Sequence, residues 1–136
     1  MYTRSHFAIS AALGVAIAAA TGATPARAAF LVAYAAILGT AIDLDHFLIA
    51  RLRLGDWRRL RFAITHPRAA FLDQSQIFED GDVGTLTRLL SHGLIAGALV
   101  AGFALSRRPF LAVFSGVVLY GHGLCDLVVD VRKYER

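Results

Sequence analysis

The sequence predicts an all-α, membrane-embedded four-helix bundle that forms a single domain over residues 1–136. Two observations carry this prediction. Hydrophobic residues make up 57% of the chain and charged residues only 18%, whereas about a quarter of the residues in soluble domains are charged. In addition, four long stretches contain no Asp, Glu, Lys or Arg, and no linker or internal repeat divides the chain.

The four uncharged stretches are the expected membrane helices, at residues 5–26, 28–42, 89–106 and 109–125. Each approaches the roughly 20 residues that a spanning helix needs, although the second and the fourth are short. Their many small residues allow helix backbones to approach closely in lipid. Thr24-Pro25 and Arg107-Arg108-Pro109 predict tight connections within the first and the second helix pair.

A polar excursion at about 51–88 separates the two helix pairs. It contains Trp57, Pro67, seven arginines and the acidic cluster Glu79-Asp80-Gly81-Asp82. We expect one amphipathic helix at about 52–64 that lies in the membrane interface. A solvated loop is the alternative.

The distribution of basic residues predicts the orientation in the membrane. If both termini and the excursion share one face, that face carries 11 of the 14 Lys and Arg, and only Arg27, Arg107 and Arg108 lie on the other. The positive-inside rule then places the termini in the cytoplasm, in a multi-pass protein of the cytoplasmic membrane that contacts lipid headgroups. Alternatively, Arg4, the apolar run and Ala26-Arg27-Ala28 form a secretory signal peptide, whose cleavage would remove His6 and leave three spans.

Four of the five histidines lie at the edge of an uncharged stretch, and all of these edges are on the predicted cytoplasmic side. Ser5-His6 opens the first helix and Ser91-His92 opens the third, whereas Asp43-Leu44-Asp45-His46 closes the second and His122-Gly123-Leu124-Cys125-Asp126 closes the fourth. In an up-down-up-down bundle these four ends meet. The remaining histidine, His66, is expected on the surface of the excursion.

These acids need a partner, because a carboxylate inside a hydrocarbon span costs about 2.5–3.5 kcal/mol on insertion scales. A divalent cation is such a partner. His122 and Asp126 are four residues apart and Asp43 and His46 are three apart, so each pair shares a helix face. Imidazole and carboxylate suit zinc, and also manganese or iron(II). The sequence therefore predicts a metal site at the mouth of the bundle.

The candidate ligands outnumber what one tetrahedral zinc uses. Either some of them, such as Asp45, hydrogen-bond a ligand or accept a proton from water, or the site holds two ions roughly 3.5–4 Å apart. Asp45 is the predicted catalytic base. An α-helix turns by about 100° per residue, so Asp45 lies about 100° from His46 and about 200° from Asp43 around the helix axis. Asp45 is therefore the residue least suited to share a coordination face with the other two.

These motifs resemble the YdjM-like family of small membrane-bound metal-dependent hydrolases. The family has a Thr-His near its N-terminus, a Pro-Asp-x-Asp-His after its second apolar segment, then a Thr-His-Ser and a His-x-x-x-Asp. In this chain Ile42 stands in place of the proline, Ser91 and Gly93 flank His92, and Thr87 occupies the position of a further histidine. The resemblance implies that the metal ligands are His6, Asp43, Asp45, His46, His92, His122 and Asp126.

Together these features predict a membrane-bound metal-dependent hydrolase, with zinc as the first choice of ion. Because the site opens at the lipid-water boundary, a phosphoester or ester of a lipid-like substrate is the expected target, and arginines of the 51–61 run would hold a phosphate. The alternative is a non-catalytic membrane protein with a structural metal clamp. A transporter ranks lower because the polar residues crowd one end, and no basic-aromatic pattern indicates nucleic acid.

Overall fold

The computed structural model describes residues 3–72, 76–79 and 81–135, and within these ranges every regular element is a helix. The elements are α1 (Thr3–Ala20), α2 (Pro25–Ala41), the 3₁₀ turn η1 (Ile42–Leu44), α3 (Asp45–Leu54), α4 (Arg58–Thr65), α5 (Pro67–Leu72), α6 (Thr85–Leu105) and α7 (Pro109–Tyr134). The all-helical prediction is confirmed.

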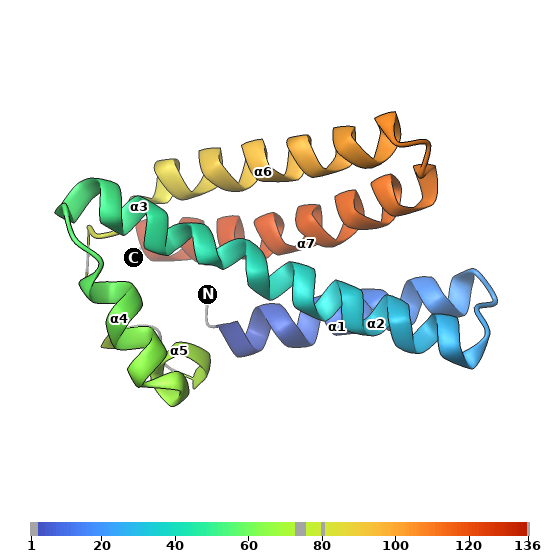
Figure 1. The fold of residues 1–136 in the computed structure, drawn as a ribbon, viewed down its shortest axis with the longest axis horizontal. Coiled ribbons are helices and arrows are strands. Elements are labelled where there is room, and N and C mark those ends of the chain that lie inside the picture. Colours follow the sequence, from blue (N-terminus) through green and yellow to red (C-terminus); the bar gives the residue numbers. More distant parts are fainter. Residues whose placement is uncertain (1–2, 73–75, 80, 136) are drawn as a thin grey trace.

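The long helices form two antiparallel pairs (Figure 1). Helix α1 packs mainly on α2 and α6 mainly on α7, and both α1 and α2 also contact α7. The tight connections predicted within each pair are present, and Pro25 and Pro109 stand in the first turns of α2 and α7, where a missing N–H is no loss. These connections lie at one end of the molecule, whereas the described ends of the chain and α3–α5 lie at the other.

The second predicted helix does not end at its charged residues. Helix α2, η1 and α3 follow one another as one apolar helical run, Pro25–Leu54. Nothing at residues 42–46 stops a helix, and the turn only tightens to 3₁₀ geometry there. The run ends at Gly55, whose φ of 82° gives the left-handed cap that glycine adopts readily. The charged motif therefore lies inside a helical run.

Among the residues that the structure describes, three helices are long and apolar enough to cross a membrane, namely Pro25–Leu54, Thr85–Leu105 and Pro109–Tyr134. This finding supports the membrane prediction by length and composition. Helix α1 is apolar but shorter.

The amphipathic helix expected at about 52–64 is divided in two at Gly55. Residues before this glycine belong to α3, and α4 begins only at Arg58. Asp56 lies two residues before α4, and its Oδ1 accepts the backbone N–H of Arg58, the first residue of the helix, at 2.9 Å. This hydrogen bond and the adjacent guanidinium lower the pKa of the Asp56 carboxyl. Ala63 on α4 is buried against Ala69 of α5.

Small residues let α1 and α2 pack closely. A Cβ added at Gly14 would lie 2.9 Å from the Cα of Val32, and one added at Gly39 would collide with the side chain of Ser10. Further from the chain ends, a core cluster joins α1, α2 and α7 through Ala18, Leu31, Ala35, Phe114 and Val118. This packing fixes the helix ends that carry the polar residues.

Candidate metal centre

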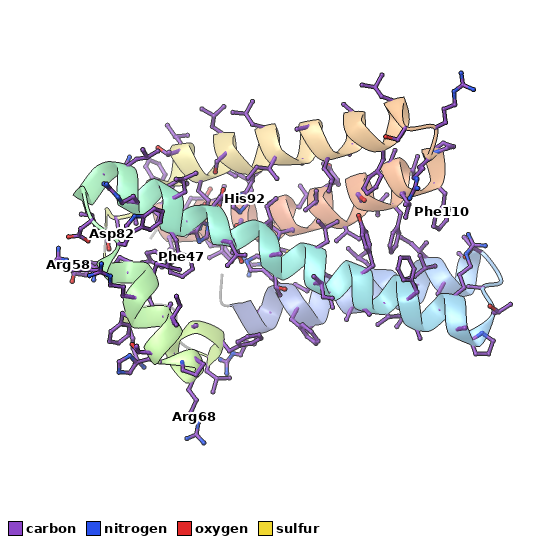
Figure 2. All side chains as sticks on the ribbon, viewed as in Figure 1. Phe47, Arg58, Arg68, Asp82, His92 and Phe110 are labelled. Carbon is purple, nitrogen blue, oxygen red and sulfur yellow. The ribbon has the colours of Figure 1, made fainter. Side chains whose placement is uncertain are left out.

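Buried histidines and aspartates from five elements converge at the end of the bundle near the chain ends. In the described part of the chain, two groups have ligand atoms that all lie within 4.8 Å of one another. The first group consists of His6, Asp43, His122 and Asp126, and the second of Asp43, His46 and His92. Asp43 belongs to both, so the two groups form one centre. In Figure 2, His92 lies between α6 and the α2–α3 run.

The first group joins α1, η1 and α7. His6 Nε2 lies 3.1 Å from Asp126 Oδ1. His122 Nε2 lies 3.3 Å from Asp43 Oδ1 and 3.5 Å from Asp126 Oδ2. The rings of His6 and His122 stack at 3.9 Å between centroids, and none of the four residues is more than 5% exposed.

The second group joins η1, α3 and α6. Asp43 Oδ1 lies 3.3 Å from His92 Nε2 and 3.6 Å from His46 Nε2. The rings of His46 and His92 are nearly parallel, with centroids 5.4 Å apart. One carboxylate thus faces three imidazole nitrogens, because His122 Nε2 also approaches Asp43 Oδ1.

A backbone contact fixes which nitrogen of His122 carries the proton. Its Nδ1 lies 2.8 Å from the carbonyl oxygen of Gly39, and a carbonyl only accepts, so Nδ1 must be the donor. In a neutral imidazole Nε2 then has a lone pair that faces the oxygens of Asp43 and Asp126. Three electron-rich atoms cannot face one another in a buried place without a positive charge between them. The choice is a second proton on His122 or a cation.

Asp45 fixes His92 in the same way. The Oδ2 of Asp45 lies 2.9 Å from His92 Nδ1 and also accepts the hydroxyl of Ser91. With Nδ1 donating, the Nε2 of neutral His92 presents its lone pair to Asp43 at 3.3 Å. A carboxylate behind a histidine is the usual arrangement for orienting a metal ligand.

Around His46 and His122 the spacings fit a cation better than a set of hydrogen bonds. Asp43 Oδ2, His46 Nε2 and His122 Nε2 are shielded from solvent and have no hydrogen bond of acceptable geometry, although His122 Nε2 is within 3.5 Å of two carboxylate oxygens. Zinc bonds of about 2.0–2.2 Å in a tetrahedron place ligand atoms roughly 3.3–3.6 Å apart. The distances of 3.3 and 3.5 Å from His122 Nε2 to the oxygens of Asp43 and Asp126 match this spacing, whereas the 3.1 Å between His6 Nε2 and Asp126 Oδ1 also suits a hydrogen bond.

Six of the seven predicted metal-site residues belong to the two groups: His6, Asp43, His46, His92, His122 and Asp126. Asp45 belongs to neither, and it instead contacts His92 and Ser91. The geometry gives Asp45 the hydrogen-bonding role that the sequence left open, while its roles as ligand and catalytic base stay predictions. His66 is exposed on the excursion, as expected.

Arg88 belongs to the site, although the sequence pattern predicted only that it ends the polar excursion. It lies in the first turn of α6, forms an ion pair with Asp130, and its Nε is 3.6 Å from Asp126 Oδ2. The spacing held a signal for this contact. Arg88 is four residues before His92 and Asp130 is four after Asp126, so in an antiparallel pair these residues face each other.

Comparisons of the chain with protein-family models, with characterised proteins and with solved structures find no match.

Gly39 links helix packing to the centre, so its replacement tests both. We expect Gly39→Ala to push α1 away from α2, because the new methyl group collides with Ser10, and to displace the carbonyl that orients His122. Overpacking of this kind typically costs about 1–3 kcal/mol. The measurement is thermal unfolding in detergent together with metal content.

The matched control is Gly102→Ala on α6, where an added Cβ meets nothing within 4 Å. It should leave both properties unchanged. If Gly39→Ala had wild-type stability and metal content, the close packing of α1 on α2 at Gly39 would be contradicted.

Proposed function

We propose that this protein is a membrane-bound metal-dependent hydrolase of the YdjM-like type. The observation that carries the proposal is the buried cluster of imidazoles and carboxylates in which the Nε2 atoms of His46 and His122 face carboxylate oxygens without an aligned hydrogen bond. In this proposal α1 is the fourth helix of a membrane bundle, and the termini and the metal site face the cytoplasm. The excess of basic residues at that end supports the orientation.

The two groups suit different tasks. The first offers four ligands, which would complete the coordination of a zinc ion, whereas the second offers three and leaves a position open. Asp43, which is common to both, would bridge two ions. Zinc is the first choice, with manganese or iron(II) as alternatives. A bound ion of this kind activates a water and polarises the scissile bond.

Other side chains of the centre would prepare it for this chemistry. Asp45 holds the Nδ1 proton of His92 and so directs Nε2 towards Asp43. Arg88 is close to Asp126 and offsets its negative charge at the edge of the centre. Asp45 is also the residue that we propose as the base. The substrate would be a phosphoester or ester of a lipid-like molecule, since the centre lies among helices suited to a membrane.

The test is metal content and hydrolysis measured on the same purified sample. The protein in detergent should contain stoichiometric metal and hydrolyse bis-p-nitrophenyl phosphate or p-nitrophenyl acetate. Chelation should stop turnover and added metal should restore it. His122→Ala combined with Asp126→Ala should abolish both properties, whereas His66→Ala, at an exposed histidine outside the centre, should change neither. Stable wild-type protein that binds no metal would defeat the proposal.

A structural metal clamp is the second candidate, and the first group favours it. Its four buried residues come from α1, η1 and α7, and they would leave no open position on a four-coordinate ion. A clamp would add metal-binding energy to folding. It predicts a large loss of thermal stability on chelation and no turnover of any ester, so the same measurements separate the two functions.

A further inference from the structure

The other helices bury little of the surface of α6. Of its 21 residues, all of them described, only His92 is buried. The helix packs on α7 and contacts α3. Between α6 and α7 lies a groove of about 360 Å³, which is within the size range of small-molecule sites, roughly 300–1,000 Å³.

The walls of this groove are mainly apolar, and His92 of the candidate metal centre is one of the residues that line it. Gly93 and Ala96 of α6 and Leu119, Gly123 and Leu127 of α7 line it together with His92. His92 Nε2 is 3.3 Å from Asp43 Oδ1, the carboxylate common to both ligand groups. The groove therefore connects the outer surface of two apolar helices with a ligand of the centre.

Glycines keep the groove open. A Cβ added at Gly93 or at Gly123 meets nothing within 4 Å, although both residues line the groove. Larger side chains at these positions would fill the space without colliding with the backbone.

We propose that this groove binds a hydrocarbon chain of a membrane lipid and presents the polar part of that lipid beside His92. The groove is a feature of two helices suited to span a membrane, so hydrocarbon chains surround it. A helix of a second copy is a poorer fit, because an α-helix with its side chains is about 10–12 Å across. The assignment of the lipid as substrate rests on the proposed hydrolase function, whereas the binding of a chain does not.

Native mass spectrometry tests the groove, because one spectrum counts bound lipid and bound metal on the same molecule. The probe is dioleoylphosphatidylglycerol, added to the full chain in dodecyl maltoside. Wild-type protein should retain one lipid. Gly93→Leu and Gly123→Leu, made singly, should lose it and keep their metal. Gly102→Leu is the matched control on α6, since it also points into open space but does not line the groove.

Metal content shows whether a variant has kept the centre, and the two single variants on different helices guard against a folding defect in one of them. If both Leu variants retained as much lipid as the wild type, the proposal that this groove binds lipid would be wrong. So would a protein dimer that dissociates on filling, because the occupant would then be a second copy. If the wild-type protein contained no metal but still lost its lipid on Gly93→Leu and Gly123→Leu, the lipid site would be supported. The proposed metal-dependent hydrolase would then be wrong.

Discussion

Asp43→Asn is expected to remove bound metal from both ligand groups. The carboxylate of Asp43 faces the Nε2 atoms of His46, His92 and His122 and is common to both groups. Loss of a partner that only orients a metal ligand typically costs about 10–100-fold in metal affinity, and loss of a shared ligand should cost more. Elemental analysis of the purified variant measures this effect directly.

Single replacements in the two groups make the prediction sharper. His6→Ala should affect only the first group and His46→Ala only the second, so each should retain part of the metal that Asp43→Asn loses. Asp56→Asn is the control, because this partly exposed carboxylate lies just before α4, outside both ligand groups, and pairs with Arg58.

The competing explanation is that protons, not metal, neutralise the centre. Breaking a buried ion pair typically costs about 3–5 kcal/mol, so Asp43→Asn would then lower thermal stability without any metal to lose. Wild-type protein that is metal-free and whose stability does not respond to a chelator would support protons and contradict the metal centre.

The sequence predicts the meeting of these residues because charge-free helices of similar length must bring their ends together. His6, His92 and the His122–Asp126 pair follow from that reasoning, and so does the shared face of Asp43 and His46. The structure differs where the sequence has no stop signal at the charges. The helix passes through residues 42–46 and ends at Gly55, since a glycine ends a helix more effectively than two aspartates do.

Spacing held a signal for the ion pair of Arg88 with Asp130, but not for the hydrogen bond from His122 to the Gly39 carbonyl. That hydrogen bond depends on helix rotation and on how closely α2 packs against α7. Spacing along one helix predicts neither quantity. The role of Asp45 is a similar case, because helical angles separate it from Asp43 but do not show that it lies behind His92.

Asp45→Asn is expected to abolish hydrolysis while the fold and the metal remain. Asparagine keeps an oxygen that can accept the Nδ1 proton of His92 and the hydroxyl of Ser91. Metal affinity should therefore fall by at most about 10–100-fold, the usual cost of disturbing such a partner. Saturating metal should restore occupancy and thermal stability to wild-type values.

The rate at saturating metal then separates two roles of Asp45. A general base contributes typically about 10²–10⁴-fold, so kcat should stay low by this factor in Asp45→Asn even with the metal bound. If Asp45 only positions His92, full occupancy should bring kcat back to near the wild-type value. Ser91→Ala is the matched comparison, because it removes a hydrogen bond to the same carboxylate but leaves the charge. The kcat of Ser91→Ala should be close to the wild-type value in either case. A loss of kcat as large as that of Asp45→Asn would contradict the role of Asp45 as general base.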